Sequence, residues 1–295
     1  MSFKKKIQSY WELTKPDITL LVLISTLLGY FLGVQFLGES ILGNPSVLIH
    51  LMIGSYLTSA GVAILNEYIE REQDATMNRT NTRPLPSGRI SPKDALIFGI
   101  SVSVMGVIDL ALLVNLYCGV LSFITIAIYL FIYTPIKQKT PWNTLVGAIP
   151  GALPPVGGWL AATGNITYQT WVVFCLLFFW QIPHFLSIAW LYRTDYKKGG
   201  FKMFMIDNKD RFQSNILLVG FCILTLIFSL FLIPTPIASI TLISICATII
   251  MGLWYVIAAL KMALKQCVKN ARRLLFVSII YIPAILVILV TGNLV

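Results

Sequence analysis

The stretch LMIGSYLTSAGVAIL, residues 51–65, has no charged side chain and runs directly into NEYIEREQDATMNRTNTRP, residues 66–84. Apolar runs like the first recur along the 295-residue chain, and about 20 such residues are needed to cross a bilayer as a helix. Only 12% of the residues are charged, against roughly 25% in soluble proteins. The runs are nearly continuous and do not alternate every second residue, so they predict helices and not barrel strands. The chain is therefore predicted to be an all-α integral membrane protein.

Nine apolar segments are predicted to span the membrane as one domain, residues 1–295. The predicted spans are Ile18–Phe36, Val47–Tyr68, Ala95–Val114, Leu116–Tyr133, Thr144–Ala162, Trp171–Leu191, Ile216–Ile233, Ile237–Leu260 and Leu274–Val290. The interruptions at Asn115 and at Pro234–Pro236 are the shortest, so the division into spans depends most on these two turns.

The lysines and arginines predict the orientation of these spans. With the N-terminus inside, all 22 Lys and Arg residues fall in inside segments and none falls in an outside loop. Inside loops of membrane proteins carry an excess of Lys and Arg, so we expect a cytoplasmic N-terminus and an outside C-terminus. This topology and the anionic inner leaflet account for the net charge of +10 without a nucleic acid partner.

The N-terminus indicates the compartment, and the cysteines are a separate feature of the composition. The first apolar run is too long for a cleaved signal sequence, and no small-residue cleavage site stands out. The opening segment also lacks the length and the Arg and Ser bias of a transit peptide, so we expect the plasma membrane of a bacterium. The five cysteines are scattered without CxxC spacing and are interpreted as packing residues.

The residues after the second span place oxygen ligands on one face of a helix. If that helix continues, Asn66, Glu70 and Asp74 lie four residues apart and form a stripe about 12 Å long. Glu72 then falls on the other side and Glu67 at the edge. Carboxylate and amide oxygens suit Mg²⁺, which commonly takes one or two carboxylates, several waters and phosphate oxygens of a substrate.

Two arginines follow this stripe. Arg79 and Arg83 are again four residues apart, and guanidinium groups bind phosphate oxygens in a bidentate manner. Carboxylates, an implied metal ion and arginines together indicate a diphosphate site. The alternative is an ordinary acidic helix end, in which Glu67 pairs with Arg71 and the other acids are solvated. Spacing alone supports the two interpretations equally.

A second polar stretch, Trp180–Phe204, begins near the end of the sixth span. Pro183 is expected to break or kink this helix, and His184 follows at once. A neutral imidazole can ligate iron, bond to a carboxylate or act as a base. The alternative, a structural histidine, is the more common case for a lone histidine on a helix. The other histidine, His50, starts the second span near the outside and is interpreted as incidental.

Charged residues follow at the inside end of the sixth span. Asp195 offers a further oxygen ligand for a metal ion, and Lys197 and Lys198 offer phosphate contacts. The alternative is a basic loop beside the membrane, and it is equally supported when this segment is considered by itself.

Several motifs resemble the UbiA superfamily of membrane prenyltransferases. Asn66, Glu70 and Asp74 match its first acidic motif, N-x-x-x-[DE]-x-x-x-D. Other motifs are similar to the branch of this superfamily that farnesylates haem: Leu13-Thr14-Lys15-Pro16, Asp74-x-x-Met77-x-Arg79-Thr80-x-x-Arg83-Pro84, Tyr133-Thr134-Pro135, Trp180-Gln181-Ile182-Pro183-His184-Phe185 and Asp195-Tyr196 before Gly199-Gly200-Phe201. The combination is specific, whereas each motif alone is weak.

The resemblance implies a nine-helix fold around a central cavity that opens to the cytoplasm and to lipid. It implies that farnesyl diphosphate, haem B and water give haem O and diphosphate, in the service of haem–copper terminal oxidases. Haem A synthase, which oxidises haem O further, becomes a candidate partner. Asn66, Glu70, Asp74 and His184 would be catalytic, with Mg²⁺ as the cofactor and His184 in contact with haem. The other implied roles are Asp195 as a metal ligand and Arg71, Arg79, Arg83, Lys197 and Lys198 as diphosphate ligands.

The chain departs from the superfamily pattern at two positions. Glu70 stands where Asp is usual, and Asp195 is all that remains of a second D-x-x-x-D motif, with Gly199 at its last position. The incomplete second motif argues against a prenyltransferase that acts on aromatic acids or quinone precursors, which is the nearest alternative.

Two alternatives belong to other functional classes. A transporter would carry ionisable residues deep in several spans, whereas Asp109 is almost the only acid well inside one. A non-catalytic haem-binding protein would explain His184 but not the acidic stripe beside Arg79 and Arg83.

Overall fold

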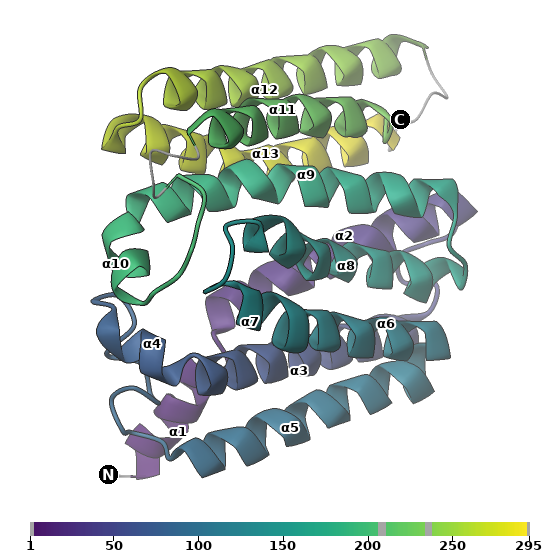
Figure 1. The fold of residues 1–295 in the computed structure, drawn as a ribbon. Helices are drawn as coiled ribbons and strands as arrows, with labels where there is room; N and C mark the ends of the chain where they lie inside the picture. Colours follow the sequence, from purple (N-terminus) through teal and green to yellow (C-terminus); the bar gives the residue numbers. More distant parts are fainter. Residues whose placement is uncertain (1–2, 206–210, 234–237, 294–295) are drawn as a thin grey trace. The chain divides into compact units, whose positions relative to one another are not determined.

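A computed structural model describes residues 3–205, 211–233 and 238–293, and the regular structure in these ranges is helical (Figure 1). Nine helical segments of the described ranges are long and apolar enough to span a membrane. They lie in α2 (Pro16–Leu37), α3 (Pro45–Ile69), α5 (Pro92–Asp109) with η1 (Leu110–Val114), α6 (Leu116–Ala127) with η2 (Ile128–Tyr133) and α7 (Thr134–Ile136), α8 (Asn143–Thr163), α9 (Tyr168–Leu191), α11 (Arg211–Leu230), α12 (Ala238–Leu264) and α13 (Val268–Asn293). The remaining helices are α1 (Phe3–Leu13), α4 (Arg71–Thr76) and α10 (Arg193–Lys198).

The predicted class and the nine predicted spans are confirmed. The predicted break at Asn115 is present because this residue is extended and caps α6: its Oδ1 accepts the Cys118 N–H at 2.9 Å. The other break, Pro234–Pro236, lies outside the described residues. The largest difference is at α13, which begins at Val268 and not at the predicted Leu274. Lysines and arginines lower the hydropathy of that first part without preventing a helix.

Helix starts follow local sequence signals. Pro16, Pro45 and Pro92 each occupy the first position of a helix, where a missing N–H has no cost and the fixed φ suits the helix. Asn44 and Ser91 precede two of these prolines, and their side chains accept backbone N–H groups of the first turn. These caps satisfy donors that the helix itself cannot pair.

The chain divides into two compact units. The first contains residues 1–140, 153–166 and 194–201, and the second contains residues 141–152, 167–193 and 202–295. In the first, α3 packs along α5; in the second, α9 packs against α11 and α13, and α12 packs against α11 and α13 (Figure 1). Helix α8 contributes residues to both units, and the expectation of a single domain stays a prediction.

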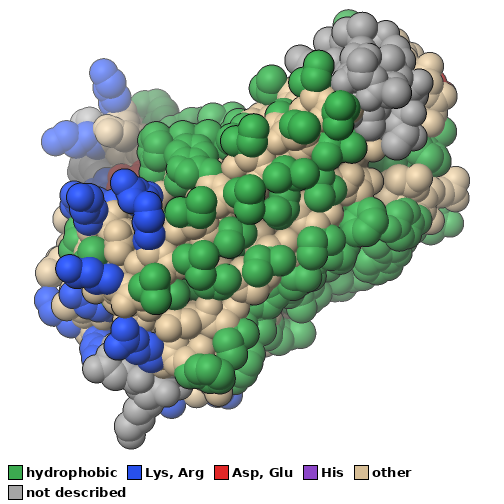
Figure 2. All heavy atoms as spheres, turned by 90° about the horizontal axis from the view of Figure 1, so that it is seen from above, with side chains coloured by type: hydrophobic (Ala, Val, Ile, Leu, Met, Phe, Trp, Pro, Cys, Tyr) green, Lys and Arg blue, Asp and Glu red, His purple; other side chains and the backbone are tan. Residues whose placement is uncertain are grey.

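Hydrophobic side chains cover most of the molecular face in Figure 2, and Lys and Arg side chains gather at one end of it. Large apolar residues are exposed in both units, among them Phe131 and Phe276. In a soluble protein an apolar surface of this extent would be unusual. The distribution is that of a protein whose helices face lipid.

Close packing of α3 against α5 yields a stability prediction. A Cβ atom added at Gly106 would lie 2.7 Å from both the backbone nitrogen and Oγ1 of Thr58. Gly106→Ala is therefore expected to lower the free energy of unfolding by about 1–3 kcal/mol, the usual cost of overpacking. The control is Gly220→Ala, because nothing lies within 4 Å of a Cβ added there. Thermal unfolding in detergent should show a lower midpoint for the first variant alone; equal midpoints would contradict the prediction.

Candidate active site

The helix predicted to continue through Asn66, Glu70 and Asp74 is interrupted at Glu70, which has φ of −93° and ψ of 10°. Helix α3 ends at Ile69, but the chain continues through Glu70 into α4 with helical hydrogen bonds. The Glu70 N–H donates to the Asn66 carbonyl at 2.9 Å, and the Asp74 N–H donates to the Glu70 carbonyl at 2.8 Å. The three side chains therefore stay on one side, and all three are buried. Glu72, predicted to face the other way, is exposed.

Each member of the stripe is paired with a cation. Arg83 Nη1 lies 2.7 Å from Asp74 Oδ2, and Lys137 Nζ lies 2.8 Å from Glu70 Oε1. Lys15 Nζ lies 3.5 Å from Asn66 Oδ1. Three positive groups from three distant parts of the sequence thus meet two carboxylates and an amide. Buried carboxylates require such partners, because an unpaired buried charge is strongly unfavourable.

Lys15 belongs to the motif Leu13-Thr14-Lys15-Pro16, but the sequence pattern does not predict a role for it. It caps the start of α2 in a left-handed conformation, with φ of 47°. Burial lowers its pKa to about 8, with a further contribution from Arg83 that the neighbouring carboxylates oppose. A charged residue directly before a membrane span was the signal available in the sequence.

Lys137 was missed altogether. It follows α7, and its Nζ lies 4.4 Å from the ring centroid of Tyr133 and 5.7 Å from that of Tyr129. Burial lowers the pKa of Lys137, but Glu70, Tyr133 and Tyr129 together outweigh burial, so the net direction of the pKa is upward. The group therefore remains a cation at neutral pH. Only its spacing of four residues from Tyr133, at an inside span end, could have indicated a shared face.

Glu67, predicted to lie at the edge of the stripe, is buried in the protein. It is 1% exposed, and its Oε1 accepts the Leu85 N–H at 3.4 Å. The alternative pair of Glu67 with Arg71 is absent. Arg71 instead donates to the Tyr68 carbonyl at 2.8 Å and pairs with Glu72 at 3.4 Å. Glu67 thus connects the loop after α4 to the end of α3, and Arg71 pairs with Glu72 rather than with the stripe.

Helix α10 lies beside the loop that carries Arg79. Arg79 Nη2 donates to the Tyr196 hydroxyl at 3.3 Å, and its guanidinium lies 5.4 Å from the Tyr196 ring centroid. Thr76 Oγ1 lies 3.3 Å from the Lys198 carbonyl oxygen. The fold therefore brings the α10 segment, with Asp195, next to the loop of the acidic stripe.

The donor set fits a magnesium ion that brings phosphate ligands with it. Among the described residues no three His, Cys, Asp or Glu side chains gather as a metal cluster, so Asp195 does not join Glu70 and Asp74. The stripe offers two carboxylates and the Asn66 amide, which are hard oxygen ligands. This number suits Mg²⁺ completed by water and substrate phosphate, and it does not suit a cage made by protein alone.

His184 belongs to the other unit. Its Nδ1 lies 2.8 Å from Ser278 Oγ, and its ring stacks on Trp180 with centroids 5.3 Å apart. Gln181 is buried and bonds to the Ala148 and Leu177 carbonyls. His50, interpreted as incidental, pairs with Asp109 at 3.0 Å between α3 and α5.

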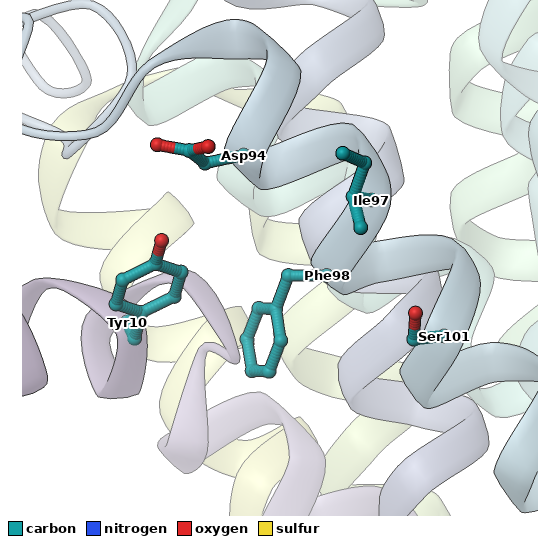
Figure 3. A pocket seen from close by; sticks show the side chains of 5 residues that line it. All are labelled: Tyr10, Asp94, Ile97, Phe98 and Ser101. Atoms are coloured by element: carbon teal, nitrogen blue, oxygen red, sulfur yellow. The ribbon is translucent and has the colours of Figure 1, made fainter.

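An open pocket lies apart from the stripe, between α1 and the start of α5 (Figure 3). It is lined by Tyr10, Asp94, Ile97, Phe98 and Ser101. Tyr10 and Phe98 contact edge to face at 5.1 Å. This lining includes no basic group, so the pocket does not suit a diphosphate.

Comparisons with known proteins identify the family of this chain. Residues 22–280 match the model of the UbiA prenyltransferase family. A protoheme IX farnesyltransferase of Solibacter usitatus is 41% identical over 283 residues, 95% of this chain and 96% of that protein. One from Salinibacter ruber is 38% identical over 281 residues, again 95% and 96%.

Solved structures show the same fold at low identity. A digeranylgeranylglyceryl phosphate synthase has a TM-score of 0.75 at 17% identity, covering 98% of this chain and 99% of that one. A UbiA homologue from Archaeoglobus fulgidus bound to GPP and Mg²⁺ has a TM-score of 0.65 at 16% identity, covering 96% and 99%.

Proposed function

The chain belongs to the UbiA prenyltransferase family, and we propose that it transfers the farnesyl group of farnesyl diphosphate to a vinyl group of haem B. Water is added in the reaction, and the products are haem O and diphosphate. The observation that best supports this proposal is that Lys15, Arg83 and Lys137 contact the side chains of the acidic stripe. The full-length similarity to protoheme IX farnesyltransferases supports haem as the acceptor.

The cations are proposed to receive the diphosphate. Lys15, Arg83 and Lys137 neutralise phosphate oxygens in a buried setting where charge interactions are strong. Arg79, held by Tyr196, supplies a further guanidinium from the loop. Arg71, Lys197 and Lys198 remain candidates for outer contacts with the diphosphate. The reaction would also require an Mg²⁺ ion, which Asn66, Glu70 and Asp74 would hold together with water and substrate phosphate.

The proposed chemistry separates charge as the diphosphate leaves. The bond between C1 of the farnesyl group and the diphosphate oxygen breaks, and the electron pair stays on the diphosphate. A haem vinyl carbon bonds to C1, and water adds to the resulting haem cation and loses a proton. Bound Mg²⁺ would supply Lewis-acid stabilisation of the leaving group. The cations aimed at the diphosphate would stabilise the same developing charge without reorganisation.

The location and partner are proposed on composition and kinship. Supported by the Lys and Arg distribution and by bacterial relatives, we assign the protein to a bacterial plasma membrane with its diphosphate site toward the cytoplasm. Haem A synthase remains the proposed consumer of haem O. The product would thereby serve the assembly of haem–copper terminal oxidases.

A product assay tests the function. The purified protein in lipid receives Mg²⁺, farnesyl diphosphate and reduced haem B, and mass spectrometry is expected to find a hydroxyethylfarnesyl haem. Removal of the metal with EDTA should abolish the product, and restored Mg²⁺ should return it. In parallel, 4-hydroxybenzoate replaces haem. A prenylated benzoate would transfer the proposal to the aromatic-acid prenyltransferases, and no product in folded protein would overturn it.

Lys15 gives the proposed reaction a pH dependence. Since its pKa is about 8, the group is a cation below this pH and loses its charge as the pH rises through it. The value of kcat/KM for farnesyl diphosphate reports the free enzyme and is expected to fall by about tenfold per pH unit above pH 8. Lys15→Arg keeps a cation at high pH, so its profile should lack this fall. An unchanged fall in Lys15→Arg would assign the titration to another group.

A further inference from the structure

The surroundings of His184 are fixed by a group that no motif included. Ser278 of α13 is fully buried, and its Oγ lies 2.8 Å from His184 Nδ1. Its backbone carbonyl accepts the Trp180 indole N–H at 2.8 Å. Trp180 in turn stacks on the His184 ring at an interplanar angle of 25°. One residue of α13 therefore holds both rings of α9.

The hydrogen bonds determine which nitrogen of His184 carries the proton. The Ser278 hydroxyl donates to the Leu275 carbonyl at 2.6 Å. A hydroxyl has a single proton, so toward His184 it acts as an acceptor, and Nδ1 is the donor. A neutral imidazole has one N–H, which leaves Nε2 with its lone pair. Within the described residues no hydrogen bond or ion pair engages Nε2.

The same surroundings decide what Nε2 can do. A general base would become an imidazolium ion, and the groups around His184 are two aromatic rings and a neutral hydroxyl. His184 is half-buried and has no carboxylate partner among the described residues, so a positive charge on its ring would be unfavourable. A metal ligand stays neutral, and donation from Nδ1 fixes the ring and raises its basicity as a ligand.

We propose that Ser278 is a positioning residue that holds His184 as the Nδ1–H tautomer, and that His184 Nε2 binds the iron of the haem substrate. This inference rests on the proposed function, because haem is the ligand that the assigned reaction brings to the protein. It identifies Ser278, rather than a residue of the WQIPHF motif, as the group that sets the chemistry of His184.

Spectroscopy of bound haem tests the proposal. The full-length protein in lipid nanodiscs is titrated with haem B, and resonance Raman spectra of the ferrous form are recorded for an iron–histidine stretching band. His184→Ala is expected to lose the band, and added imidazole should restore an iron–imidazole band. Ser278→Ala should shift the band and weaken haem binding about 10- to 100-fold, the usual effect of removing a partner of a ligating histidine.

Two further variants separate positioning from folding. Ser278→Thr keeps the hydroxyl and should restore the band and the affinity. Ser229→Ala removes another fully buried hydroxyl of this unit, one that bonds to Tyr281 at 2.9 Å, and should leave both unchanged. A band retained in His184→Ala would overturn the iron contact, and a wild-type band and affinity in Ser278→Ala would overturn the role of Ser278. Wild-type protein that farnesylates haem without any iron–histidine band would sink the inference alone. A His184-bound haem that receives no farnesyl group would sink the proposed function alone.

Discussion

Replacing Asp74 with Asn is expected to reduce kcat for haem farnesylation by about 100- to 1,000-fold, the range found when a group that stabilises transition-state charge is removed. The substitution keeps the shape of the side chain but removes the charge that a metal ion and Arg83 both require. Asp74 is 2% exposed, and its Oδ2 lies 2.7 Å from Arg83 Nη1. Its backbone carbonyl accepts Thr80 Oγ1, a bond that Asn retains, so the loop should keep its structure.

Steady-state kinetics and thermal unfolding together test this expectation. The matched control is Glu72→Gln, which neutralises an exposed acid of the same short helix and should leave turnover unchanged. Asp74→Asn should lose little stability, so its unfolding midpoint should stay near the wild-type value although kcat falls by about 100- to 1,000-fold. A variant that farnesylates haem at the normal rate would rule out Asp74 as part of the site.

The fold could be predicted because the bilayer leaves few choices. A chain in lipid must pair its backbone groups internally, so each long apolar run has to be a helix. Hydropathy locates the lipid-facing part of a helix but not its full length. Helix α13 begins at Val268, before the predicted Leu274, because a charged first turn is still helical although it is no longer apolar.

In the candidate site, too, the residues that follow a local pattern could be predicted and those placed by tertiary packing could not. Asn66, Glu70 and Asp74 could be predicted because their spacing of four residues matches the helical period, and i to i+4 hydrogen bonds continue from α3 across Glu70 into α4. Lys137 and Lys15 reach the stripe from other helices, and no local pattern carries that information. The burial of Glu67 depends on the Leu85 N–H, which is a tertiary contact. Spacing finds partners within one element, and packing decides the partners between elements.

Lys137→Met is expected to lower the free energy of unfolding by about 3–5 kcal/mol, the cost of removing one partner of a buried ion pair. The side chains of Lys137 and Glu70 are 12% and 11% exposed, and their charged atoms lie 2.8 Å apart. Without Lys137, the Glu70 carboxylate would stay buried without its counterion. Thermal unfolding in detergent measures the loss, and Lys139→Met, at an exposed lysine of the same loop, is the control.

A double variant separates the structural role of Lys137 from its proposed binding role. In Lys137→Met with Glu70→Gln both charges of this ion pair are removed and neither is left without its partner, so most of the lost stability should return. The proposed diphosphate contact would still be missing, and kcat/KM for farnesyl diphosphate should remain low. Lys137→Arg keeps the cation and should retain part of this activity. If the double variant regains both stability and activity, Lys137 serves only to neutralise Glu70, the Glu70 carboxylate is not required by the metal ion, and the positive charge that stabilises the departing diphosphate must come from Lys15 and the arginines.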